Sequence, residues 1–97
     1  MEVFFIWLFL DMSFTTYIIY SQTLDRYYIG STADINDRLI RHNKGNGWTY
    51  TKKAKDWELS WKREFETRSE ASSLEHLIKK KKSRKYIEYL ISIDKKE

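Results

Sequence analysis

The chain contains no cysteine, no proline and only three glycines among its 97 residues. Without cysteine, neither a disulfide nor a zinc site built from thiolates can hold the fold together. That absence fits a reducing compartment, and we expect the protein to be cytoplasmic. Because the sequence also has no internal repeat and no linker, its length predicts a single small domain.

Long apolar runs are absent as well. The run "VFFIWLFL" (Val3–Leu10) is well short of the ~20 residues that a membrane-spanning helix needs, so we expect no membrane partner. It also lacks the basic region and the small-residue cleavage site of a signal peptide. We therefore set residues 1–12 apart as an apolar leader and treat residues 13–97 as the folded domain. Either Met12 is the true start, or the leader packs as an extra edge strand or an oligomer contact.

Positive charge exceeds negative charge by 4 at neutral pH, and many of the lysines are concentrated in two places. "KKAK" covers Lys52–Lys55 and "IKKKKSRK" covers Ile78–Lys85. Such a basic surface suits a polyanion such as DNA, although a lysine run taken alone is about as often a solvated helix face. The candidate nucleic-acid-binding residues in these stretches are Lys52, Lys53, Lys79, Lys80, Lys82, Arg84 and Lys85.

The pattern beyond Met12 predicts an α+β domain with the element order β-β-α-β-α-α. β-branched and aromatic residues indicate a hairpin, and apolar residues at 57, 59, 61 and 65 indicate a half-buried third strand. Ser31 with Asp34, and "TRSE" from Thr67, are helix-capping signals. The predicted strands are 15–21, 26–32 and 57–65, and the predicted helices are 31–43, 67–82 and 83–93. The apolar stripe predicted for the last helix consists of Tyr86, Tyr89, Leu90 and Ile93.

Two predicted helices carry polar groups on the stripe that should pack against the sheet. The stripes are Ile35, Arg38, Leu39 and His42 in one helix and Ala71, Leu74, Glu75 and Ile78 in the other. Burying a charge without a partner costs several kcal/mol, so these groups must pair, bind something or line a cleft. The structural alternative is an ion pair between Arg38 and Glu75, with His42 as a hydrogen-bonded neighbour.

Tyr17 and Tyr28 lie on the two strands of the predicted hairpin, and Gly30 follows inside the second strand. Because side chains alternate along a strand, the three positions can share one face. A glycine there leaves a gap where a side chain would block access to the backbone. The structural alternatives are two core tyrosines and a β-bulge. Neither explains why the polar groups of two later helices should face the same place.

Taken in order, these residues resemble the GIY-YIG nuclease superfamily. "YIIY" from Tyr17 is followed by "YIG" (Tyr28–Gly30), and then by an arginine at 38 and a histidine at 42. A helical glutamate follows at 75, within "SEASSLEHLIKKKKSRKYIEYLI", which is similar to the ends of small stand-alone bacterial members. The resemblance covers nearly all of residues 15–93. It implies a three-stranded antiparallel sheet flanked by helices, in agreement with the predicted element order.

The resemblance also implies a function: metal-dependent hydrolysis of DNA phosphodiester bonds, in DNA repair or in the processing of structured DNA. Glu75 would bind Mg²⁺ or Mn²⁺, and Arg38 would contact the phosphate. Tyr17 would be the general base if the cation and Arg38 lowered its pKa from ~10. Tyr28 and His42 would orient water or relay protons, which completes the implied catalytic set. The expected partner is DNA, branched or single-stranded, with a protein partner or a homodimer left open.

Gly30 would keep the floor of this site open to a phosphate backbone. The sequence departs from the family pattern in two places. The first motif has Thr15 and Thr16 instead of glycine and isoleucine, which leaves the tyrosine chemistry intact. No asparagine follows the glutamate, as is often the case in the small stand-alone members. The polar residues that could replace it are Ser83, Arg84 and Lys85.

Two other functions remain open at this point. The domain could bind branched or single-stranded nucleic acid without cutting it, with Trp48, Tyr50 or Trp57 as stacking surfaces beside the lysines. It could instead be a protein-interaction module whose lysines only keep it soluble. The presence of a carboxylate among the tyrosines, arginine and histidine favours the nuclease, because a pure binder has no use for a buried carboxylate near phosphate.

Overall fold

The computed structural model describes residues 13–45 and 50–95, so the apolar leader and Trp48 lie outside the described residues. The strands are β1 (Phe14–Ser21), β2 (Arg26–Thr32) and β3 (Trp57–Phe65). The helices are α2 (Ile35–Asn43), α3 (Arg68–Lys81) and α4 (Arg84–Lys95), with a short 3₁₀ turn, η1, at Thr51–Lys53. The predicted α+β fold and its element order are confirmed. No helix in the described ranges combines the length and the apolarity needed to cross a membrane.

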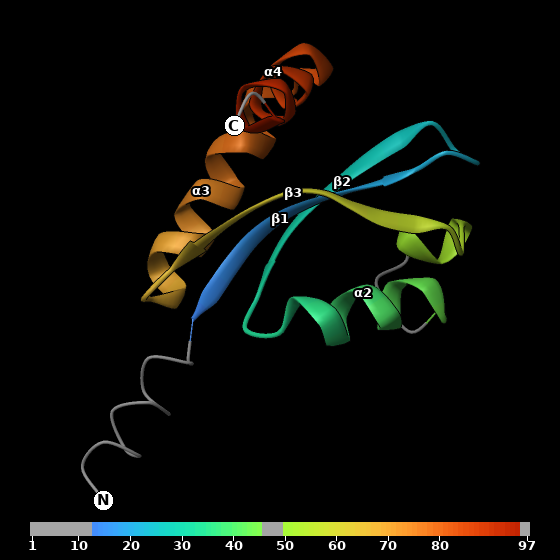
Figure 1. The fold of residues 1–97 in the computed structure, drawn as a ribbon, viewed down its shortest axis with the longest axis horizontal. Helices are drawn as coiled ribbons and strands as arrows, with labels where there is room; N and C mark the ends of the chain where they lie inside the picture. The colour runs from blue at the N-terminus through green and yellow to red at the C-terminus, as the bar shows by residue number, and fades with distance from the viewer. Residues whose placement is uncertain (1–12, 46–49, 96–97) are drawn as a thin grey trace, which may run out of the picture.

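β1 is the central strand of an antiparallel sheet with the order β2-β1-β3. Both faces of this sheet are covered, which is why Thr15–Ile19 in β1 are all buried. α2 and η1 lie on one face, and α3 with α4 lie on the other (Figure 1). We call these the α2 face and the α3/α4 face. β2 and β3 are the two edges of the sheet, and β2 is the edge that matters for the site.

The two faces have separate cores. On the α2 face the buried cluster consists of Tyr17, Ile19, Ala54 and Trp57. On the α3/α4 face it consists of Ile18, Trp61, Ile78, Ile87 and Leu90. Successive residues of β1 therefore supply opposite cores, as the alternation of side chains in a strand requires.

A β-bulge in β3 sends its two tryptophans to opposite faces. The pairing with β1 skips Ser60, and the residues on either side of it meet consecutive residues of β1. Trp57 and Trp61 would share a face in a regular strand, but the extra residue turns one of them over. Leu59, which the alternating pattern placed on the buried face, is 39% exposed. The apolar positions of β3 thus form two short stripes rather than one.

The capping signals are partly confirmed. Thr67 is the N-cap of α3, and its side chain accepts a hydrogen bond from the backbone N–H of Glu70. α2, however, begins later than predicted, because Asp34 is its N-cap and accepts from the N–H of Asp37. Ser31 therefore does not cap α2; it stays in β2 and donates to a carboxylate of α3.

The stripe predicted for α4 is confirmed at three of its four positions. Leu90 is buried and Tyr86 and Ile93 pack against the same core, whereas Tyr89 is 57% exposed. Ser83 Oγ accepts a hydrogen bond from the N–H of Tyr86 at the start of the helix. Ile87, which lies next to the predicted positions, belongs to the same buried core.

Candidate active site

A cavity of about 360 Å³ lies at the outer edge of β2. Because β2 is an edge strand of the sheet that the described residues form, side chains from both of its faces can reach the cavity. Tyr28 and Gly30 point to the α2 face, while Ser31 points to the α3/α4 face. The complete lining is Tyr17, Tyr28, Gly30, Ser31, Arg38, Glu75 and Lys79. Four of the five predicted catalytic residues are thus brought to one cavity, together with Gly30.

Gly30 accommodates the ring of Tyr17. The two residues are direct partners in the β1–β2 ladder, and a Cβ at position 30 would lie 2.5 Å from the Tyr17 hydroxyl. The ladder is regular here, so the β-bulge alternative is wrong. The gap that was expected to expose the backbone is instead filled by the tyrosine, although Gly30 still borders the cavity. Glycine is required because no side chain fits beneath the Tyr17 ring.

His42 lies behind Tyr17 and is fully buried. Its Nε2 is 3.0 Å from the Tyr17 hydroxyl, and its Nδ1 is 2.9 Å from Thr51 Oγ1. The imidazole is therefore held between two hydroxyl groups, one at the cavity and one in η1. Tyr28 packs against it with its ring edge, at a centroid distance of 5.3 Å. His42 reaches the cavity only through Tyr17.

Burial sets the protonation states of this pair. It raises the pKa of Tyr17, the nearby Tyr28 raises it further, and the positive charge of Arg38 opposes both effects without overcoming them. Burial, followed by the charge of Arg38, lowers the pKa of His42 to about 4. At neutral pH the tyrosine is protonated and the histidine is neutral. Arg38 alone therefore does not lower the pKa of Tyr17 as a general base would require.

Arg38 and Glu75 do not pair with each other. Glu75 Oε1 accepts a hydrogen bond from Ser31 at 2.7 Å, and Oε2 forms an ion pair with Lys79 at 2.6 Å. Arg38 has no ion-pair partner within residues 13–45 and 50–95. The structural alternative, an Arg38–Glu75 ion pair, is therefore wrong. The guanidinium of Arg38 lines the cavity as an uncompensated positive charge.

Glu75 is the only carboxylate that lines the cavity in the described part of the chain. Its side chain is 16% exposed, so it is largely desolvated but still accessible. No group of three or more histidine, aspartate or glutamate side chains within the described ranges is arranged to hold a metal ion. A cation at this site would have to be one that accepts a single protein carboxylate.

The predicted nucleic-acid-binding residues are spread more widely. Lys79 lines the cavity and lies over the ring of Tyr28, at 5.9 Å from its centroid. The stacking surfaces are partly corrected: Trp57 is only 2% exposed, while Tyr50 is partly exposed and stacks on Tyr28. The remaining cations are exposed and do not line this cavity, namely Lys52, Lys53, Lys80, Lys82, Arg84 and Lys85.

The residues proposed to replace the downstream asparagine do not reach this cavity. Ser83 caps α4, and Arg84 forms ion pairs with Asp25 at 2.7 Å and Glu88 at 3.1 Å. Sequence reasoning missed two residues that do contact the site, Ser31 and Thr51. Ser31 could have been found from the alternation of β2, which places it opposite Gly30. No sequence pattern points to Thr51.

The comparisons with known proteins agree with this geometry. A family model described as the GIY-YIG catalytic domain matches residues 13–87. A UPF0213 protein of Streptococcus pneumoniae serotype 4 is 41% identical over 64 residues, which are 66% of this chain and 65% of that protein. The UPF0213 protein YazA of Bacillus subtilis is 40% identical over 65 residues, which are 64% of this chain and 66% of that protein. The chain thus spans just under two thirds of the length of these relatives.

A solved structure is similar over a larger share. It is the solution NMR structure of the UPF0213 protein BH0048 from Bacillus halodurans, which is 29% identical to this chain. The likeness covers 84% of this chain and 85% of that chain, with a TM-score of 0.53. Because the family model matches residues 13–87, which is most of the chain, the chain belongs to the GIY-YIG family, a family of the nuclease type.

Proposed function

We propose that the protein is a divalent-metal-dependent endonuclease that hydrolyses DNA phosphodiester bonds. One observation carries the proposal: Glu75, Arg38 and Tyr17 meet in a single cavity. They supply a carboxylate, an uncompensated guanidinium and a phenol that is hydrogen-bonded to a neutral imidazole. Phosphodiester hydrolysis needs these kinds of group, namely a metal ligand, a charge that meets the phosphate and an acid–base pair.

Glu75 is the residue that would hold the cation. Mg²⁺ is usually bound through one or two carboxylates, retains several waters and contacts substrate phosphates, so a single carboxylate at an open cavity fits it. Mn²⁺ accepts the same oxygen ligands. A cation bound here would polarise the phosphate and stabilise the leaving 3′ oxygen. Lys79 occupies Glu75 Oε2 in this structure, so it must release that oxygen before a cation can use it.

Arg38 would bind the scissile phosphate. Its planar guanidinium can donate two parallel hydrogen bonds to phosphate oxygens, and it is always protonated. Because it has no carboxylate partner among the described residues, no ion pair must break before phosphate binds. The same charge would stabilise the negative charge that develops on the phosphate oxygens in the transition state.

Tyr17 would take a proton from the attacking water. Because burial keeps its hydroxyl protonated, it must pass on its own proton, and His42 Nε2 lies 3.0 Å away to receive it. The water oxygen then bonds to phosphorus, the bond from phosphorus to the 3′ oxygen breaks, and that oxygen takes a proton from solvent. This relay uses the tautomer with hydrogen on Nδ1, which Thr51 Oγ1 can accept at 2.9 Å.

We infer that the substrates are DNA structures met in repair or in the processing of branched DNA in the cytoplasm. The inference is supported by the exposed lysines of η1 and α3, which can neutralise phosphates on either side of the scissile bond. A second function is favoured by one specific contact. Lys79 already neutralises Glu75, so a domain that never releases this ion pair would bind nucleic acid without cutting it.

Cleavage assays separate the two functions. Purified protein would be incubated with labelled single-stranded, flapped and branched DNA, and with RNA of the same sequence, in Mg²⁺, in Mn²⁺ and in chelator. We expect metal-dependent DNA products, and at least about a 100-fold loss of rate in Glu75→Gln and in Arg38→Gln. Glu58→Gln, an exposed position on β3, removes the same charge away from the cavity and should cut at the unmutated rate.

The opposite results are also informative. Retention of products in chelator, or full activity in Glu75→Gln, would contradict the metal-dependent mechanism. Binding of every DNA substrate without products would identify the protein as the non-catalytic binder. Products from RNA alone would correct the substrate.

A further inference from the structure

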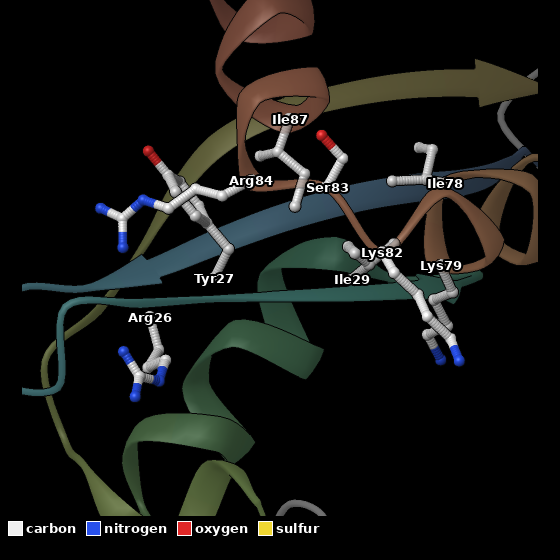
Figure 2. Close-up of a pocket in the computed structure, with 9 residues that line it drawn as sticks. All are labelled: Arg26, Tyr27, Ile29, Ile78, Lys79, Lys82, Ser83, Arg84 and Ile87. Carbon is white, nitrogen blue, oxygen red and sulfur yellow. The ribbon is translucent and has the colours of Figure 1, made fainter.

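A second cavity lies next to the active-site cavity, on the α3/α4 face of β2 (Figure 2). It has a volume of about 320 Å³, at the low end of the range of small-ligand pockets, which is roughly 300–1,000 Å³. Its walls are the first half of β2, the end of α3 and the start of α4. We call it the α3–α4 cavity. Neither the family resemblance nor the proposed catalytic set uses it.

The floor of the α3–α4 cavity is apolar. It is formed by Ile29, Ile78 and Ile87, which lie on the side of β2 that faces α3 and α4 (Figure 2). Ile78 and Ile87 also belong to the buried core of this face, so the floor is rigid. An inorganic anion has no use for such a floor. A small cavity with an apolar floor instead suits an organic group such as a nucleobase.

The rim of the cavity is basic. Arg26 stands at one end and Lys79 with Lys82 at the other, and their charged groups extend to the same side of β2 (Figure 2). Within residues 13–45 and 50–95, no carboxylate lines the cavity, and neither Arg26 nor Lys82 has an ion-pair partner. Arg84 also borders the cavity, but Asp25 and Glu88 already neutralise it. Arg26, whose Nη1 also donates to the Asp25 carbonyl at 3.3 Å, and Lys82 therefore stand at the two ends of the cavity without an ion-pair partner among the described residues.

Lys82 occupies a backbone position that usually favours glycine. It is the C-cap of α3 with a φ of 48°, in the left-handed region. A residue with a Cβ costs about 1 kcal/mol more than glycine at such a position. Lys82 is thus present despite this backbone strain. Its Cα lies in the turn between α3 and α4, and the packing of these two helices fixes the position of that turn. Backbone strain of this kind is often found at ligand sites.

Lys79 connects the two cavities, because it lines both of them. It lies one helical turn beyond Glu75 on α3. A strand whose phosphate is held by Arg38 can therefore continue along the edge of β2 into the α3–α4 cavity. A nucleic-acid strand is a ligand that repeats an anionic group and a flat apolar group along one chain, which matches the rim and the floor together.

We propose that the α3–α4 cavity binds one unpaired nucleotide of the strand that occupies the active-site cavity. The base lies on the isoleucine floor, and the flanking phosphates bind Arg26 and Lys82. The proposal rests on the proposed function for its ligand class, since it takes nucleic acid to be the substrate. It goes further in assigning a preference: a base buried in this cavity cannot be paired, so the protein would favour single-stranded and flapped DNA over blunt duplex.

A ligand titration tests the base and the phosphate together. Protein labelled at isoleucine methyls and backbone amides would be titrated with thymidine 5′-monophosphate, and separately with thymidine and with inorganic phosphate. We expect the nucleotide to shift the methyls of Ile78 and Ile87 and the amide of Lys82, with at least about tenfold tighter binding than either fragment. Equal shifts from phosphate alone, or unmoved isoleucine methyls, would overturn the proposal.

Affinity measurements test the two cations. The double variant Arg26→Gln/Lys82→Gln would be compared with Lys44→Gln/Lys62→Gln, which removes the same charge from exposed residues outside both cavities and outside η1 and α3. In chelator, the first pair should bind single-stranded DNA about 10- to 100-fold more weakly than unmutated protein and leave duplex affinity within about threefold. Loss of two phosphate contacts should also reduce the slope of log affinity against log salt by about 1.4. Equal weakening by both double variants would show diffuse charge attraction and overturn the proposal.

These readouts are independent of cleavage. Shifts at the isoleucine methyls with no DNA products would leave the nucleotide site standing and reject the nuclease. Products with no shifts at these methyls would do the reverse.

Discussion

The two faces of the sheet have cores of different chemistry. The α3/α4 face is packed with isoleucines, a leucine and a tryptophan. The α2 face carries Tyr17 and Trp57 in its core, and His42 and Thr51 are fully buried beside them. Polar groups on this face are satisfied by one another, since Tyr17 contacts His42, His42 contacts Thr51, and Trp57 Nε1 donates to the Thr51 carbonyl at 2.9 Å.

This difference shows how a small domain can combine stability with a reactive site. On one face, mainly apolar packing holds β1 in place, with one buried hydrogen bond from Thr16 Oγ1 to the Ala71 carbonyl at 2.6 Å. The other face can then bury groups whose protonation is shifted, because a chain of hydrogen bonds limits the penalty of their burial. The candidate active site lies where the two faces meet, at the edge of β2. The following experiments would break or sharpen this contrast.

The largest effect should come from two neighbours in β1 that serve opposite faces. Ile18 and Ile19 are both 0% exposed. Replacing either with alanine should lower the free energy of unfolding by about 3 kcal/mol, because each leaves a cavity in a packed core. Only Ile19→Ala should also slow cleavage by the folded protein, because Ile19 packs in the cluster that contains Tyr17. Urea unfolding and turnover rates measure the two quantities, and equal slowing by both variants would refute the separation.

Acid should weaken the α2 face selectively. Burial lowers the pKa of His42 from 6.5 to about 4, so the unfolded chain takes up a proton on this residue more readily than the folded protein. The stabilisation is complete above pH 6.5 and is lost as the pH falls towards 4, by about 3 kcal/mol in all. Chemical denaturation across this range would measure it. His42→Gln should flatten the curve, and His76→Gln, at an exposed position, should leave it unchanged.

The smallest effect concerns the two tryptophans of β3. Trp57 Nε1 donates to the Thr51 carbonyl, whereas Trp61 Nε1 is buried with no acceptor among the described residues. Trp57→Phe removes one donor from the Thr51 carbonyl, which still accepts from the backbone N–H of Ala54 at 3.4 Å, and Trp61→Phe removes an unsatisfied donor. We expect Trp57→Phe to be the more destabilising by about 1 kcal/mol, the typical net contribution of one hydrogen bond, measured by urea unfolding. If the two variants unfold alike, hydrogen bonding does not distinguish the faces.

The sequence was sufficient to predict the helices and strands, and to predict that most of the candidate site residues lie close together. Helical spacing placed Arg38 and Glu75 on the faces that pack towards the sheet, and strand alternation placed Tyr28 beside Gly30. Both signals are local, because each depends only on the period of one element. They predicted that Tyr17, Tyr28, Arg38 and Glu75 share one place, and these four residues line the cavity. The fifth candidate, His42, lies on the same face of α2 as Arg38 and contacts Tyr17. Their catalytic roles remain predictions.

The features that could not be predicted from the sequence depend on contacts between segments that are far apart in the chain. The bulge at Ser60 arises where β3 meets β1, and no residue type at that position demands it. Lys79 looked like one member of a lysine run, and only the packing of α3 against β2 shows that it lies between two cavities. Thr51 contacts His42 because the segment after α2 returns to the sheet through η1. Tertiary contacts of this kind produce no periodic pattern in the sequence.

Gly30 has a consequence for how this fold could change over time. A strand position normally tolerates many side chains, but here the space above the backbone belongs to the Tyr17 hydroxyl. Position 30 is therefore restricted to glycine for as long as position 17 is a tyrosine. A lineage that gave up the tyrosine would gain the freedom to fill position 30, and the sheet would remain intact. A glycine at position 30 is thus expected wherever the Tyr17 side chain is retained.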